Sequence, residues 1–149
     1  RVPDRVHRHG GVPCLRAPDC VACGGGRVTR PILYISGPYS SGNGRTVTHN
    51  IQIAQEYAAI AWMKGWAAFT PHLNTANFEL YCPTVEHSDW LAGDLAILDR
   101  LRPGHDAILM LPNWQQSPGA RREREAAQLL GLIVYYADAI AGGVPEVPE

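Results

Sequence analysis

The sequence lacks any long apolar segment. None of its apolar runs approaches the ~18 residues that a membrane-spanning helix needs, and no charged-then-apolar leader precedes the first predicted strand. We therefore expect a soluble protein of the cytoplasm without a membrane partner. Internal repeats and low-complexity tracts are also absent. The 149 residues are 46% hydrophobic, which suffices for the core of one globular domain.

The sequence also has little net charge, but its charges are unevenly distributed. Residues 1–30 contain six Arg against Asp4 and Asp19, so this segment is positive and the rest of the chain carries about −5. An acidic domain repels a phosphate backbone. Polymeric nucleic acid is therefore not an expected partner.

Cysteine is scarce, and three of its four residues lie close together in the first 30. A disulfide framework is not expected in a chain with this much core. Cys14, Cys20 and Cys23, together with His9, have the residue types of a tetrahedral zinc site, and the short Cys20-x-x-Cys23 spacing suits one, although the spacing from Cys14 is irregular. We therefore treat residues 1–30 as an irregular extension that could hold a structural zinc ion. No cofactor is expected for catalysis.

Residues 31–149 show the alternation of an α/β domain. Short β-prone runs alternate with segments of helical period, which indicates a mostly parallel sheet covered by helices. Strands are predicted at 32–36, 66–70, 106–111 and 132–136, and helices at 46–64, 88–98 (capped by Ser88 or Asp89) and 117–130, with a polar loop at 72–86. In such folds ligands bind beyond the carboxyl ends of the strands. The loops at 37–45 and 112–119 are therefore the candidate binding segments.

The predicted helix that follows Ser117 contains an inward-facing acid. Gly119, Glu123 and Leu130 share one helical face, so Glu123 is predicted to face the sheet. A buried carboxylate costs free energy unless it is paired or functional. Glu123 is therefore a catalytic candidate, although a carboxylate that rises into solvent or pairs with an arginine fits the pattern equally well. Gly119 and Ala120 leave room at the helix start, where free N–H groups favour an anion.

The loop after the first predicted strand is rich in glycine and hydroxyl groups. It matches neither GxGxxG nor a Walker loop, which argues against a dinucleotide or triphosphate site. Gly37, Ser40, Ser41 and Arg45 would still suit a sugar or a single phosphate. The alternative is a flexible glycine-rich turn.

Three further polar residues are weaker candidates. Asp94 flanks an apolar helical stripe and could work with Glu123, because two carboxyl groups in unlike environments can divide nucleophile and acid roles. By pattern alone, a solvated helix residue is the commoner case. His72 and Asn74 follow the second predicted strand and could hydrogen-bond a base, but they are equally ordinary loop residues.

Together these segments resemble the nucleoside 2-deoxyribosyltransferase superfamily, including its deoxynucleotide N-hydrolase and cytidylate N-glycosidase branches. The resemblance rests on five segments within 32–136: Tyr34–Ser40, Pro71-His72, Asp94-Leu95, Asp106–Pro112 with Trp114, and Ser117-x-Gly119-Ala120-x-x-Glu123-x-x-x-Ala127-x-x-x-Gly131. It implies a flavodoxin-like (Rossmann-like) three-layer fold with a mostly parallel sheet of about five strands. Homodimers or larger assemblies are expected by the same resemblance.

The resemblance also implies roles for individual residues. Glu123 would be the nucleophile, Asp94 the helper acid, and Tyr39 the aromatic residue over the sugar. Ser117 occupies the position where the nucleotide hydrolases contact a 5′-phosphate, and the chain after Tyr136 offers no Asn or Gln of the kind that the transferases use. Hydrolysis of a nucleoside 5′-monophosphate is therefore the first hypothesis. Base exchange between nucleosides and a catalytically inactive nucleotide-binding protein are the alternatives.

Overall fold

The structure is a computed structural model that describes residues 29–40 and 46–148. The predicted zinc ligands, and two residues of the candidate anion loop, lie outside the described residues: His9, Cys14, Cys20, Cys23, Ser41 and Arg45. In the part of the chain that is described, no helix is long and apolar enough to cross a membrane.

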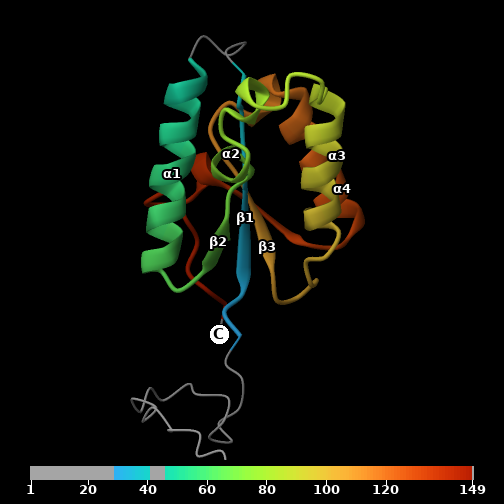
Figure 1. Ribbon diagram of the computed structural model, residues 1–149. Coiled ribbons are helices and arrows are strands. Elements are labelled where there is room, and N and C mark those ends of the chain that lie inside the picture. The colour runs from blue at the N-terminus through green and yellow to red at the C-terminus, as the bar shows by residue number, and fades with distance from the viewer. Residues whose placement is uncertain (1–28, 41–45, 149) are drawn as a thin grey trace, which may run out of the picture.

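A parallel sheet forms the middle layer (Figure 1). Its four strands lie in the order β2 (Ala67–Phe69), β1 (Ile32–Ser36), β3 (Ala107–Met110) and β4 (Ile133–Tyr136). All neighbouring pairs are parallel. The predicted α/β class is therefore confirmed, with four strands in the described residues instead of about five.

Helices cover both faces of this sheet. In Figure 1, α1 (Val47–Met63) lies on one side, and α3 (His87–Leu98) and α4 (Pro118–Leu129) lie on the other. Shorter helical turns connect these elements: α2 (Pro71–Asn74), η3 (Phe78–Leu80), η4 (Trp114–Gln116) and η5 (Ala137–Ala139). All four turns fall in segments for which no helix or strand was predicted, because one turn of helix is too short to show a period.

The ends of the long helices are capped by side chains. Thr46 accepts a hydrogen bond from the His49 N–H, and Ser117 accepts one from the Ala120 N–H, both at 3.2 Å. The predicted cap of α3 is wrong. Glu86, not Ser88 or Asp89, is its N-cap, and the Asp89 carboxylate reaches back to the Glu86 N–H at 3.0 Å, which completes a capping box.

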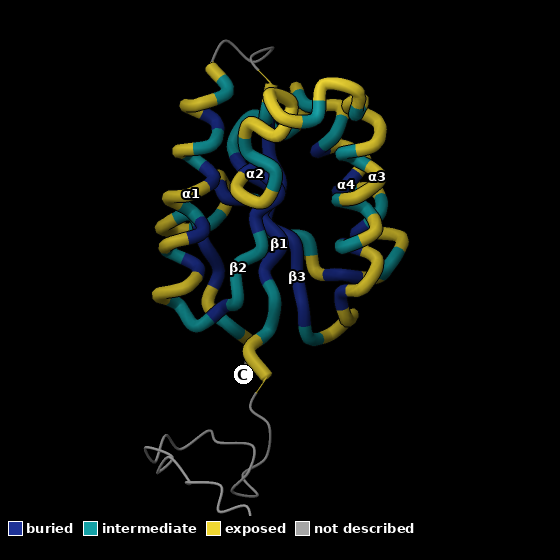
Figure 2. The backbone as a smooth tube through the Cα atoms, in the orientation of Figure 1, coloured by how far each residue is buried: buried dark blue, intermediate teal, exposed yellow. Residues whose placement is uncertain are grey.

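Each face of the sheet has its own core, and alternate residues of β1 divide between the two. Leu33 and Ile35 pack with α1, whereas Tyr34 packs with residues of α3 and α4. Figure 2 shows the middle strands β1 and β3 largely in the colour of buried residues. The central strand therefore presents Tyr34, and by the same alternation Ser36, to the α4 side.

The C-terminal segment belongs to the α1-side core. Val144 is fully buried there. The Trp66 Nε1–H donates to the Pro145 carbonyl at 2.9 Å, and Lys64 Nζ donates to the Val144 carbonyl at 2.7 Å. Lys64 also forms an ion pair with Glu146. These contacts hold the segment that follows one edge strand, β4, against the residues that precede the other edge strand, β2.

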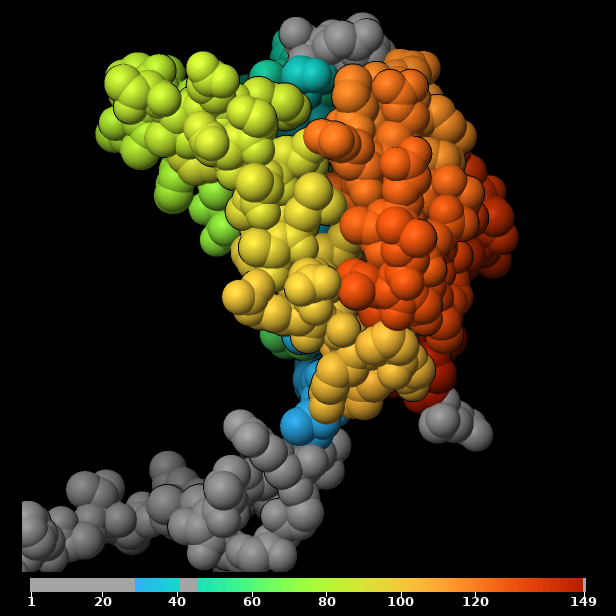
Figure 3. Space-filling model, turned by 90° about the vertical axis from the view of Figure 1, so that its right-hand side faces the viewer, coloured from blue at the N-terminus to red at the C-terminus, as the bar shows by residue number. Residues whose placement is uncertain are grey.

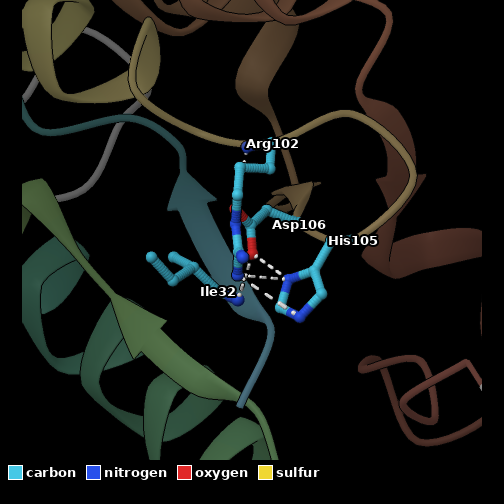
Figure 4. Close-up of polar contacts among 4 residues, drawn as sticks. All are labelled: Ile32, Arg102, His105 and Asp106. Carbon is cyan, nitrogen blue, oxygen red and sulfur yellow. Dashed lines mark hydrogen bonds and ion pairs between the residues drawn. The ribbon is translucent and has the colours of Figure 1, made fainter. Parts of the chain in front are cut away.

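A cluster of polar side chains lies at the amino-terminal ends of β1 and β3 (Figure 4). Asp106, which is 1% exposed, accepts hydrogen bonds from the backbone N–H groups of Ile32 and Arg102 at 2.9 and 2.8 Å. His105 Nδ1 lies 2.7 Å from the same carboxylate, and Arg102 Nε lies 3.5 Å from it. The loop before β3 is thus joined directly to the start of β1.

Candidate functional site

A pocket lies near the carboxyl ends of the strands, where the parallel topology predicts a ligand site. It is bounded by the loop after β1, by the segment that includes α2 and η3, and by α3 and α4. Eight predicted site residues line it: Gly37, Tyr39, His72, Asp94, Ser117, Gly119, Ala120 and Glu123. It also includes residues that the sequence did not single out, among them Thr75, Glu79, His87, Trp90 and Leu91.

Glu123 lies at the buried end of the site. It is 5% exposed and faces the sheet, as the helical pattern predicted. The Tyr34 hydroxyl donates to Glu123 Oε1 at 2.7 Å, and the Ser36 hydroxyl donates to Oε2. Within the described residues its partners are therefore two hydroxyl groups, not an arginine, and it does not rise into solvent.

Tyr34 and Ser36 were missed as site residues by the sequence reasoning. A signal for them exists, because they are alternate residues of one strand and must share a face. Which face meets α4 depends on how the chain crosses over the sheet, and that is not visible in the strand itself.

The electrostatics of the pocket centre on two carboxyl groups. Burial raises the pKa of Glu123 to about 7; the hydrogen bonds from Ser36 and Tyr34 oppose this rise, and the charge of Asp94 adds to it. Burial likewise raises the pKa of Asp94 to about 6, and nearby His87 opposes that rise. Both pKa values therefore lie near neutral pH, and over a range of pH the pair of groups together holds one proton.

Asp94 belongs to a stripe of α3 that faces the pocket. His87, Trp90, Leu91 and Asp94 follow the i, i+3, i+4, i+7 spacing of one helical face, and all four line the pocket. Asp94 is half-buried and lines the pocket, so it differs from an ordinary solvated helix residue. Phe78 meets the Trp90 ring edge-on at 6.1 Å between centroids.

The segment between α2 and α3 is attached to Tyr39 at the pocket mouth. The Tyr39 hydroxyl accepts from the Asn77 N–H at 3.2 Å and lies 3.3 Å from both carboxylate oxygens of Glu79. In Figure 3 this segment projects from the body of the molecule. Its side chains Leu80 and Tyr81 are 75% and 83% exposed, which places apolar surface beside the pocket.

His72 is a buried, neutral member of the pocket wall. Burial lowers its pKa, although the backbone carbonyls of Pro38 and Gly37 oppose this shift. Its Nε2 lies 2.8 Å from the Pro38 carbonyl, so Nε2 carries the proton that the hydrogen bond needs. The Tyr39 and His72 ring centroids are 5.8 Å apart. This contact joins the loop after β1 to α2.

The start of α4 offers a site for an anion. Gly119 lies in the first turn, where a backbone N–H has no partner within the helix. The prediction of two free N–H groups needs correction, because the Ala120 N–H already donates to the Ser117 hydroxyl. A ligand at this helix start would therefore use the Gly119 N–H and the proton of the Ser117 hydroxyl.

Two predicted binding residues lie outside the pocket. Ser40 is exposed, and its carbonyl accepts a hydrogen bond from Asn50 Nδ2 at 3.0 Å. Asn74 is exposed at the end of α2. Neither belongs to the pocket lining of the described chain. Among the residues that the structure describes, no group of three or more His, Cys, Asp or Glu side chains could hold a metal ion.

The fold and site together define a parallel α/β protein with a carboxylate-containing pocket at the carboxyl ends of its strands. Residues 31–136 match the model of DUF4406, a domain of unknown function. This match covers well over half of the chain, and the protein therefore belongs to the DUF4406 family. No curated protein matches the chain significantly.

Proposed function

We propose that the protein is an N-glycosidase that hydrolyses the base–sugar bond of a nucleoside 5′-monophosphate, with Glu123 as the nucleophile. One observation carries this proposal. A buried carboxylate, oriented by two hydroxyl groups, shares a pocket with a second carboxyl group whose pKa is raised to about 6. The resemblance to the nucleoside 2-deoxyribosyltransferase superfamily supports the same assignment.

The first step would form a covalent intermediate. A Glu123 oxygen attacks the anomeric carbon of the sugar, and the bond from that carbon to the base nitrogen breaks. The bonding electron pair leaves with the base, which takes a proton from the Asp94 carboxyl group. Cleavage through an oxocarbenium-like transition state needs a nearby carboxylate and an acid for the leaving group, and the pocket supplies both.

The second step would release the sugar phosphate. The Asp94 carboxylate takes a proton from a water molecule, whose oxygen attacks the anomeric carbon and displaces Glu123. Both carboxyl groups then return to their starting protonation states. The products are the free base and the sugar 5-phosphate. In base exchange, the alternative reaction, a second base would replace water in this step.

The start of α4 would bind the 5′-phosphate. The Ser117 hydroxyl and the Gly119 N–H lie at the positive end of the helix dipole, which favours an anion. Ser117 is the N-cap of the helix that contains Glu123 and precedes it by six residues, so a phosphate there would place the sugar between the helix start and the nucleophile. This arrangement supports a monophosphate substrate over an uncharged nucleoside.

The remaining pocket residues would contact the sugar and the base. Tyr39 and Trp90 both line the pocket; Tyr39 would stand over the sugar, and Trp90 would offer an aromatic surface on α3. His72 is held neutral, so it adds no charge to the wall.

We also propose a homodimer, because Leu80 and Tyr81 form exposed apolar surface beside the pocket. Light scattering after size-exclusion chromatography would measure the oligomeric state.

The decisive experiment is release of free base from a panel of nucleosides and their 5′-monophosphates, followed by chromatography. We expect base release with the sugar 5-phosphate as co-product, and kcat/KM at least about 100-fold higher for monophosphates, from two charge-assisted contacts. Equal efficiency on nucleosides, with transfer to an added base, would favour base exchange. Binding without any base release would favour the inactive nucleotide-binding alternative.

A further inference from the structure

Ser36 lies behind the nucleophile and not in the pocket. Its side chain is fully buried, and it is not among the described residues that line the pocket. Its hydroxyl donates to Glu123 Oε2, while the Tyr34 hydroxyl donates to Oε1. Each carboxylate oxygen thus receives one hydrogen bond from the central strand, and a bound substrate would touch neither donor.

This arrangement favours the ionised form of Glu123. A hydroxyl group has one proton to donate, so both donors are satisfied only when both Glu123 oxygens can accept. When Glu123 is protonated, one of its oxygens becomes a donor, and one hydroxyl must turn its proton elsewhere. Ser36 and Tyr34 are both 0% exposed, so water does not take over that role.

The carboxylate of Asp94 has no hydrogen-bond donors of this kind among the described residues. No hydroxyl or amide group in the described part of the chain donates a hydrogen bond to its carboxylate. The other titratable groups that face the pocket are Tyr39 from the loop after β1, His72 from α2, Glu79 from η3 and His87 from α3. Of Glu123 and Asp94, only Glu123 is therefore stabilised as an anion by direct donors.

We propose that Ser36 is a positioning residue that divides the roles of the two carboxyl groups. Its hydroxyl raises the population of the form in which Asp94 carries the proton and Glu123 is the anion, which is the form that the first chemical step requires. Because the pKa of Glu123 is about 7 and that of Asp94 about 6, this form is the minor one, and it would be rarer still without Ser36. The catalytic consequence rests on the proposed N-glycosidase function. The effect on the ionisation of Glu123 does not.

The ionisation is measured directly by carbon-13 NMR of protein labelled at the glutamate side-chain carboxyl carbon, with Glu123→Gln identifying the resonance. Ser36→Ala is expected to raise the pKa of Glu123 by about one to two units, the usual effect of one hydrogen bond to a charged group. Ser36→Thr keeps the hydroxyl and is expected to restore the original value. If the added methyl prevents folding, Ser36→Cys, nearly isosteric and a weak donor, should give an intermediate value.

Kinetics provides the second measurement. In Ser36→Ala the maximal kcat is expected to fall about 10- to 100-fold, because the productive arrangement of the shared proton becomes rarer by the factor that corresponds to one or two pKa units. The alkaline limb of the pH profile should move to higher pH. KM should stay unchanged, since Ser36 does not line the pocket.

The role of Ser36 and the N-glycosidase assignment can be refuted independently of each other. An unchanged pKa of Glu123 in folded Ser36→Ala would overturn the role of Ser36, whatever the activity. A raised pKa together with no base release from any substrate would leave the ionisation role standing and refute the hydrolase assignment. A fall in kcat without a shift of the pKa or the pH profile would show that Ser36 acts only through packing, and the proposal would be abandoned.

Discussion

The carboxylate of Asp106 accepts a hydrogen bond from the backbone N–H of Ile32 at 2.9 Å, so the residue before β3 fixes the first residue of β1. Burial disfavours the charged carboxylate, but the donors from Ile32, His105 and Arg102 outweigh it and hold the pKa of Asp106 below its usual range. The contact therefore links the stability of the sheet to an ionisation.

Asp106→Asn is expected to lower the free energy of unfolding by about 1–3 kcal/mol at pH 7, because a buried charge-assisted acceptor is lost. Since the folded pKa lies below the unfolded one, the stabilisation is present above the unfolded pKa of about 4 and is lost as the pH falls through the folded pKa. The difference between the variant and the original should therefore shrink in acid. Urea unfolding at several pH values measures this difference in unfolding free energy. A difference that does not change with pH would refute the link between the ionisation of Asp106 and stability.

Glu123→Gln should abolish base release while changing the free energy of unfolding by no more than about 1–2 kcal/mol. The amide removes the nucleophile, but it retains an oxygen for one hydroxyl and offers an N–H₂ group to the other. Glu123→Ala is the contrasting variant, since it leaves both hydroxyl groups without their acceptor and should unfold at lower temperature. Substantial turnover by Glu123→Gln would rule out the nucleophile role.

The rate of base release should follow a bell-shaped pH profile. With pKa values of about 6 for Asp94 and about 7 for Glu123, the pair holds one proton between these values. The limbs report the pair and not either residue alone. kcat/KM should rise as the pH increases through about 6 and fall above about 7.

Asp94→Asn should reduce kcat by about 10²–10⁴-fold, because the leaving base then has no acid to protonate it. It should also abolish the alkaline limb of the profile, leaving a rate that rises with the ionisation of Glu123. Stopped assays over a range of pH check both effects. An unaffected rate would return Asp94 to a role in packing or solvation.

Ser117→Asp should erase the preference for monophosphates. The new carboxylate would stand beside the Gly119 N–H and repel a phosphate, yet it can still cap α4 as Ser117 does. Ser117→Ala is the matched control without the added charge and should reduce the preference less. Comparing kcat/KM for a monophosphate and its nucleoside tests this, and an unchanged ratio in Ser117→Asp would place the phosphate elsewhere.

The long, strongly patterned elements could be predicted from the sequence. The strand at 32–36 follows from a continuous apolar and β-prone run, and the direction of Glu123 follows from the helical spacing of the residues that share its face. Two errors have physical causes. Asp89 is a common cap residue, but it is the third residue of α3, and η3 is too short to show a period. The fifth strand was expected only from the family resemblance, and the described residues form four.

The site was predictable only in part. Glu123, Asp94 and Ser117 each belong to a helix whose wheel or cap indicates their direction. Ser40 and Asn74 were chosen for their polar side chains in loops after strands, where no period indicates direction. The hydroxyl partners of Glu123 could not be predicted from the sequence. Tyr34 and Ser36 precede Glu123 by 89 and 87 positions, and they meet it only after β1 and α4 have packed together.

The position of Tyr34 and Ser36 on β1 affects how the protein should respond to heat. β1 has neighbours on both sides, and its amides should therefore exchange with solvent among the slowest in the chain, only in global opening. Hydroxyl groups carried by such a strand do not move with loop fluctuations. The orientation of Glu123 should therefore persist on warming until the whole domain melts, and thermal inactivation should coincide with unfolding instead of preceding it.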